Sequence, residues 1–157
     1  MQSDSSLEIN IQRWLELSDK PENIAISAWM KDAIALPLLA ELFSRSPYLS
    51  KLALKYPSVI HDLMATDANT AFNHILDQVC LSERLDSTHK NLKFTLREAK
   101  NKAALLIACA DISGMWSLDK VTAALTELAE RSLRITLNAL LLVAGQRGEI
   151  AVRNMDD

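Results

Sequence analysis

The sequence contains little glycine, little proline and few aromatic residues. Only three of its 157 residues are glycine, four are proline, and Phe, Trp and Tyr together make up 5%. The only closely spaced glycines, Gly145 and Gly148, follow a predicted helix rather than a strand, which excludes a local glycine-rich phosphate loop. Apolar residues make up 49% of the chain, and most are Leu, Ala and Ile, which favour helices. We therefore expect an all-α fold.

The chain also lacks an excess of positive charge and a long apolar run. Its 17 basic and 20 acidic residues give a formal charge of -3, which argues against binding to nucleic acid or to an anionic membrane. The longest apolar stretches, Ala103 to Ala110 and Ala139 to Ala144, are far shorter than the ~20 residues of a membrane span. The polar start of the chain does not have the pattern of a signal peptide. We expect a soluble, cytoplasmic protein.

Two cysteines and three histidines provide no metal or redox motif. Cys80 and Cys109 each lie in an apolar helical pattern, so we expect two buried, reduced thiols. His61, His74 and His89 lie on three different predicted helices, and none has a metal-ligand residue type four positions away. We expect no metal site, no cofactor site and no catalytic residue in this chain.

The first part of the chain predicts short helices with clear start signals. Ser46 and Asp67 are residue types that cap helix N-termini, and Pro47 and Pro57 suit a first helical turn. Each of these helices has too few apolar residues to be stable alone, so each must pack on something larger.

Two longer helices, at about 88–113 and 117–145, provide that larger element. A turn containing Gly114, which suits a left-handed helix end, separates them, and Ser117 can cap the second helix. Each helix carries an apolar seam with alternating steps of four and three residues: Leu92, Leu96, Ala99, Ala103, Leu106, Ala110 and Ser113, then Leu118, Val121, Leu125, Leu128, Ser132, Ile135, Ala139 and Leu142. Matching seams across a short turn predict an antiparallel hairpin on which the short helices pack.

The domain organisation that follows is simple. We expect a disordered tail at residues 1–6, a single helical domain at 7–145 and a truncated linker at 146–157. No internal repeat or low-complexity segment is present.

A few residues in the hairpin are candidates for function. The first long helix is locally basic, and its outer face could meet a phosphate or an acidic partner, although a solvated face is the simpler explanation. The basic residues are Lys90, Lys93, Arg97, Lys100 and Lys102. Asp111 lies beside the turn, where a helix-terminal acid bonded to a neighbour is the expected role. Trp14, Trp29 and Trp116 suit partly buried anchoring positions.

The same hairpin resembles a known enzyme family. The segment from Leu96 to Gly114, followed by Trp116 to Leu118 and Val121 to Leu128, is similar to the glutamine synthetase adenylyltransferase family. Upstream, Arg45 to Leu49 and Tyr56 to Leu63 resemble the beginning of those enzymes. The similarity extends over about residues 36–150.

This resemblance implies a helical N-terminal segment of a large bifunctional enzyme. One nucleotidyltransferase domain of such an enzyme attaches AMP to glutamine synthetase and another removes it by phosphorolysis, with Mg²⁺ and with ATP, AMP or phosphate. Glutamine synthetase and the PII signalling protein are the implied partners of the whole enzyme. The family's Gly-Lys-Met-Gly and Ser-Asp-x-Asp motifs are absent from this sequence. Since the paired aspartates of that motif hold the magnesium ions, we expect the chain alone to be inactive.

The implied role is therefore a scaffold for a downstream nucleotidyltransferase domain of the same polypeptide. Arg97, Lys100, Asp111 and Trp116 are the candidate interdomain contacts. The alternative is a self-contained helical module that binds a partner through an apolar patch beside Tyr48 and Leu49 or at Leu140 to Leu142. A reading frame that continues past Asp157 into a Ser-Asp-x-Asp strand would favour the first. In either case the open edge of the hairpin predicts self-association.

Overall fold

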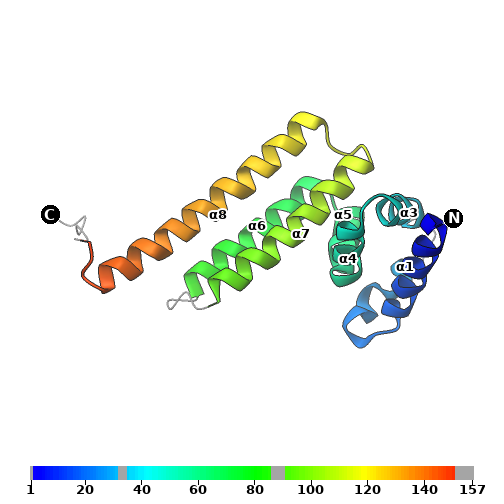
Figure 1. Ribbon diagram of the computed structural model, residues 1–157, viewed down its shortest axis with the longest axis horizontal. Coiled ribbons are helices and arrows are strands. Elements are labelled where there is room, and N and C mark those ends of the chain that lie inside the picture. Colours follow the sequence, from blue (N-terminus) through cyan, green and yellow to red (C-terminus); the bar gives the residue numbers. More distant parts are fainter. Residues whose placement is uncertain (1, 32–34, 86–90, 151–157) are drawn as a thin grey trace.

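The computed structural model describes residues 2–31, 35–85 and 91–150, and within these residues the chain is helical without strands (Figure 1). The predicted all-α class is confirmed. The elements are α1 (Gln2–Ser18), the 3₁₀-helix η1 (Pro21–Ile26), α2 (Ser27–Met30), α3 (Leu36–Arg45), α4 (Pro47–Lys55), α5 (Pro57–Ala65), α6 (Ala68–Leu85), α7 (Leu92–Ile112) and α8 (Leu118–Gln146).

The helix starts follow the capping residues in the sequence. Ser46 caps α4, where its hydroxyl accepts a hydrogen bond from the Leu49 amide at 3.3 Å. Asp67 caps α6 and accepts from the Thr70 amide at 3.0 Å and the Thr70 hydroxyl at 2.5 Å. These bonds from Thr70 lower the pKa of the Asp67 carboxyl, because they stabilise its charged form. All three predicted caps are confirmed, since Ser117 accepts from an amide of α8 at 3.4 Å.

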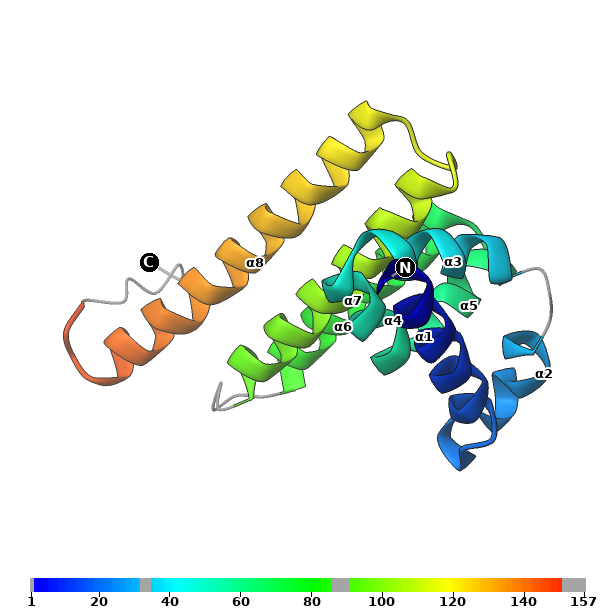
Figure 2. The same ribbon diagram turned by 45° about the vertical axis from the view of Figure 1, so that its right-hand side comes forward.

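The core lies between the α6–α7 pair and the short helices. α6 and α7 run side by side, and α3, α4 and α5 pack against α7 (Figures 1 and 2). α1 packs against α3 and α4. Its Trp14 is fully buried, and the indole Nε1 donates a hydrogen bond to the Met30 carbonyl at 2.9 Å. The largest side chains with almost no exposure include Phe72, Leu39, Leu42, Ile60, Leu63, Leu76, Leu105 and Leu106.

α8 turns back from α7 at Gly114 and runs alongside it. Gly114 has φ +71°, the left-handed conformation that glycine adopts at helix ends, as the sequence predicts. Among the described helices α8 contacts only α6 and α7. Arg131 adds a polar link, because its guanidinium lies 2.8 Å from Glu127 and 3.9 Å from Asp77 on α6. The bounds of both long helices agree with the predicted ones, except that residues 88–90 lie outside the described residues.

Most of the seam residues predicted for α7 are buried, whereas many of those predicted for α8 are exposed. Leu92, Ala99, Ala103, Leu106 and Ala110 are buried in α7. In α8 the buried residues are Ala124, Ile135 and Ala139, whereas three predicted seam leucines are exposed: Leu118, Leu125 and Leu142. The physical reason is that α8 has neighbours on one narrow side only. The buried face of α8 passes through Ala124, and the predicted Leu118 and Leu125 are exposed beside it.

The start of the chain also differs from the prediction. Residues 2–6 belong to α1 rather than to a disordered tail. The sequence there is rich in Ser and Asp, residue types that are favourable in the first turn of a helix. At the other end α8 continues to Gln146, one residue into the predicted linker, and residues 151–157 lie outside the described residues.

Candidate interaction surface

An open groove lies between α7 and α8. It consists of two adjacent pockets of about 430 Å³ and about 460 Å³, both lined by Leu96, and we call it the α7–α8 groove. The first pocket is lined by Leu96, Arg97, Lys100, Leu125, Leu128, Ala129 and Ser132. The second is lined by Leu92, Lys93, Leu96, Thr136, Ala139, Leu140 and Val143. The floor is thus apolar and is formed by one face of each helix.

The C-terminal half of α8 is apolar on nearly every side. Between residues 133 and 144 only Arg134, Thr136 and Asn138 are polar. A helix that is apolar all round is normally buried, yet here five leucines are about half exposed or more. They are Leu133, Leu137, Leu140, Leu141 and Leu142, with Leu133 at 70% exposure. Such a surface is typical of a contact with another protein part.

A row of basic side chains runs along the α7 edge of the groove. Lys93, Arg97 and Lys100 are spaced four and three residues apart, which places them on one face of the helix. All three are exposed, and none forms an ion pair with another of the described residues. No acidic residue lines either pocket. The groove therefore combines an apolar floor with an unneutralised positive edge.

The four predicted interdomain residues fall in two places. Arg97 and Lys100 line the groove. Asp111 is exposed in the last turn of α7, where its carbonyl accepts from the Gly114 amide at 3.0 Å. Trp116 is buried at the turn, with its ring 5.7 Å from that of Phe72 in an edge-to-face arrangement. The structure brings the first two together at one surface and places the other two at the end of the hairpin.

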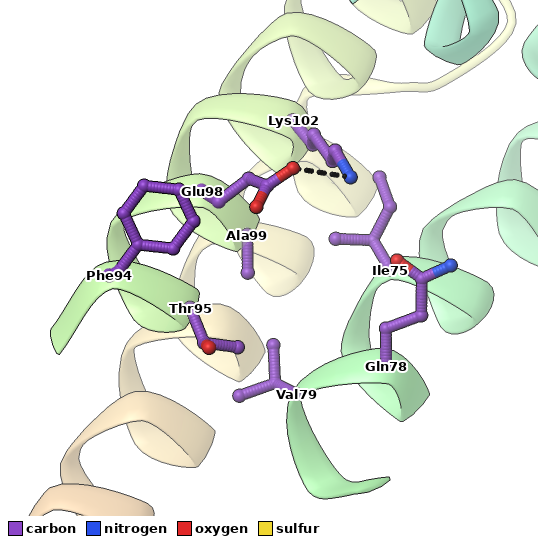
Figure 3. A pocket seen from close by; sticks show the side chains of 8 residues that line it. All are labelled: Ile75, Gln78, Val79, Phe94, Thr95, Glu98, Ala99 and Lys102. Atoms are coloured by element: carbon purple, nitrogen blue, oxygen red, sulfur yellow. Dashed lines mark ion pairs between the residues drawn. The ribbon is translucent and has the colours of Figure 1, made fainter. Parts of the chain in front are cut away.

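A second, smaller pocket lies between α6 and α7. It has a volume of about 160 Å³, and Figure 3 shows Ile75 and Val79 facing the α7 side chains across it. Its charged groups already neutralise each other, because Lys102 Nζ lies 2.9 Å from Glu98 Oε1 (Figure 3). Phe94 stands at its rim and is 68% exposed. This pocket is small and locally neutral, so the α7–α8 groove is the better candidate site.

Reactive groups are scattered in the described part of the chain. Burial raises the pKa of the Cys109 thiol to about 12, which keeps it protonated and unreactive at neutral pH. His61 on α5 lies 3.3 Å from Asp62, His74 is on α6, and His89 is outside the described residues. Among residues 2–31, 35–85 and 91–150, no three His, Cys, Asp or Glu side chains come close enough to hold a metal ion. Nor does any helix in these ranges have the length and hydropathy needed to cross a membrane.

Comparison with known proteins identifies the family. The sequence pattern of the glutamate-ammonia ligase adenylyltransferase family matches residues 36–155, which include α3 to α8 and thus the whole groove. The chain belongs to this family. The adenylyltransferase pattern begins at the start of α3, so α1, η1 and α2 precede the matched region.

Several adenylyltransferases resemble the chain over a small part of their length. It is 37% identical over 123 residues to the bifunctional glutamine synthetase adenylyltransferase/adenylyl-removing enzyme of Rhodopseudomonas palustris (strain HaA2), which covers 78% of this chain and 12% of that enzyme. The enzyme of the same name from Bartonella quintana (strain Toulouse) is 28% identical over 151 residues, 92% of this chain and 16% of the relative. The enzyme of this name from Bradyrhizobium sp. (strain BTAi1 / ATCC BAA-1182) is 27% identical over 150 residues, which make up 96% of this chain and 15% of the relative. No solved structure gives a significant match.

Only part of the groove is identified from the sequence. Leu140 belongs to the predicted apolar patch at Leu140 to Leu142 and lines the groove, whereas the lining residues Leu125 and Leu128 are missed. Leu125 and Leu128 fit a heptad seam, so periodicity places them in the hairpin contact rather than beside it. A signal was nevertheless present. The stretch from 133 to 144 is apolar on all sides, which a helix with one partner on one side cannot satisfy.

Proposed function

We propose that this chain is a non-catalytic helical part of an enzyme that attaches AMP to glutamine synthetase and removes it. The proposal rests on the family match over residues 36–155. The relatives carry both activities in their names, and the chain corresponds to 12% to 16% of their length. The α7–α8 groove and the exposed leucines of α8 are the surface by which it would support a nucleotidyltransferase domain of the same polypeptide.

The proposed role is structural because the chain has no motif for the chemistry. Nucleotidyl transfer uses paired carboxylates that hold magnesium ions beside the phosphates, and the Ser-Asp-x-Asp motif is absent from the sequence. Magnesium, ATP, AMP and phosphate would then be bound by other parts of the enzyme. The same holds for glutamine synthetase and the PII signalling protein, the partners that we propose for the whole enzyme.

The energetics favour a contact at α8. Covering the exposed half of one leucine contributes about 1 kcal/mol, so five such leucines form a substantial docking surface. The leucines outside the groove, namely Leu133, Leu137, Leu141 and Leu142, would lead to self-association of the chain in isolation. We also propose a cytoplasmic location, because Cys80 and Cys109 are free thiols, as is usual in a reducing compartment.

An activity assay tests the proposal. The pure 157-residue chain is incubated with glutamine synthetase, ATP and Mg²⁺, and separately with adenylylated glutamine synthetase, phosphate and Mg²⁺. We expect no AMP transfer and no AMP release. Turnover in either reaction would show that the chain itself carries catalytic groups and would contradict the structural role.

A chimaera tests the same proposal in a complete enzyme. In the Rhodopseudomonas palustris (strain HaA2) relative, the segment matched by this chain is replaced with the corresponding residues of this chain. We expect both activities to be retained, whereas deletion of the segment should abolish at least one of them. A deletion variant that folds and keeps both activities would refute the support role.

A further inference from the structure

We infer that the α7–α8 groove binds an amphipathic helix whose apolar stripe is flanked by acidic residues. This inference rests on the proposed function, because the helix would belong to the part of the enzyme that this chain does not contain. The docked segment would be amphipathic and acidic, which the support role alone does not specify.

The shape of the groove fits a helix. On α8 the lining residues extend from Leu125 to Val143, a separation of 18 residues or roughly 27 Å along the helix axis, and all are apolar except Ser132 and Thr136. This length accommodates about five helical turns. The α7 side contributes Leu92 and Leu96, so a third helix would lie against apolar residues on both sides. Grooves of this kind recognise apolar residues at i, i+3, i+4 and i+7 of the helix they bind.

The positive charge of the groove favours acidic residues on either side of the apolar stripe of the bound helix. Lys93, Arg97 and Lys100 stand in a row at the α7 edge without an ion pair to another described residue. The remaining basic residue of α7, Lys102, is neutralised by Glu98 at 2.9 Å and does not line the groove. Glutamate or aspartate at the edge of the bound stripe would neutralise the row.

The same row disfavours a second copy of this chain as the occupant. In a symmetric dimer the same patch of each subunit faces the other, and no acidic residue lines this patch, so a second copy would bring no group that neutralises the basic row. An acidic helix would neutralise the basic row instead.

Two synthetic peptides test the inference with the full 157-residue chain. Both are fluorescent 18-residue helices with leucines at i, i+3, i+4 and i+7; one has glutamates flanking the stripe, and the other has lysines at the same positions. We expect the glutamate peptide to bind at least tenfold more tightly than the lysine peptide, with an affinity that falls as salt increases. Equal affinities of the two peptides, or no binding of either, would overturn the inference.

Reversing the charge of two basic residues tests whether the groove itself causes the preference for the glutamate peptide. In Arg97→Glu/Lys100→Glu the preference should reverse, with the glutamate peptide bound at least tenfold less tightly and the lysine peptide more tightly than by the unmodified chain. The matched control is Arg13→Glu/Lys51→Glu, which makes the same change of charge on exposed residues of α1 and α4, helices that do not contact α8. The control should bind the glutamate peptide within twofold of the unmodified chain. A loss of binding that is equal in the control would assign the effect to net charge and overturn the inference.

A substitution of an apolar lining residue tests whether the peptides bind in the α7–α8 groove. Leu125 is 50% exposed, so Leu125→Glu should leave the fold intact by circular dichroism while it weakens both peptides at least tenfold. Unchanged affinity in a folded Leu125→Glu protein would place the peptides elsewhere and refute the groove.

The two proposals can fail separately. If the chimaeric enzyme described above is active and Arg97→Glu/Lys100→Glu within it leaves both activities and the unfolding temperature unchanged, the acidic-helix inference fails and the support role stands. If deletion of the whole segment leaves both activities unchanged, the support role fails.

Discussion

α7 and α8 are neighbours in sequence and in space, yet they are packed very differently. Eight of the 21 residues of α7 are buried, whereas only three of the 29 residues of α8 are. α7 has neighbours on several sides, among them α3, α4, α5, α6 and α8, while α8 contacts only α6 and α7 among the described helices. The difference shows that α7 is enclosed by the described helices, whereas α8 has a large open face. Four predictions test this comparison.

The largest difference should appear in thiol reactivity. Cys109 of α7 is fully buried with a pKa raised from 9.0 to about 12, which lowers its thiolate fraction about a thousandfold. A cysteine introduced by Leu137→Cys on the exposed face of α8 should instead react like a free thiol. Alkylation at pH 8, followed peptide by peptide by mass spectrometry, measures both rates. Similar rates at the two positions would show that α7 opens as readily as α8.

A truncation in the core of α7 should strongly destabilise the chain. Leu106 is 1% exposed, and Leu106→Ala removes buried methyl groups and leaves a cavity. We expect the free energy of unfolding to fall by about 3 kcal/mol, measured by urea denaturation followed by circular dichroism. A loss below about 1 kcal/mol would mean that α7 is not the centre of the core.

A smaller truncation tests the main attachment of α8. Ile135 is 1% exposed and is the largest buried side chain of that helix. Ile135→Val deletes one methylene and should lower the free energy of unfolding by about 1 kcal/mol. The same urea titration measures this change. No measurable effect would indicate that α8 is held mainly by its link through Arg131 and not by packing.

The smallest effect is expected on the open face of α8. Leu137 is 52% exposed, so Leu137→Ala should change the free energy of unfolding of this chain by less than about 0.5 kcal/mol. In the complete enzyme the same substitution should be destabilising if this face is covered there. An equal, small effect in both proteins would argue that the face is not an interface.

The parts of the fold that could be predicted from the sequence are those that depend on local chemistry. Ser46, Asp67 and Ser117 cap helices because a side-chain oxygen reaches an amide two or three residues away, and Gly114 ends α7 because it can adopt a positive φ. Most of the predicted α7 seam residues are buried because α7 is apolar on the side that packs against several other helices.

The parts that could not be predicted depend on which neighbours are present. α8 has apolar residues on almost all sides after Leu133, so the period of the pattern does not select the buried face there, and Leu142 is assigned to the wrong one. Leu118 and Leu125 precede this stretch and fit the predicted seam, but the residue that is buried in that part of α8 is Ala124. The basic residues Arg97 and Lys100 can be placed on a shared face from their spacing. The groove beside them depends on how far α8 lies from α7, which no local pattern encodes.

The unequal lengths of the two helices have a mechanical consequence. α8 is longer than α7 by eight residues, or about 12 Å, and its orange-red end reaches past the ends of α6 and α7 (Figure 1). The helix as a whole measures roughly 43 Å from the Gly114 turn outward. Ile135 and Ala139 hold α8 well beyond its middle, so the stretch that extends past the last buried residue is Leu140 to Gln146, roughly 10 Å long. α8 therefore ends in an overhang of about two helical turns that projects beyond its anchor at Ala139.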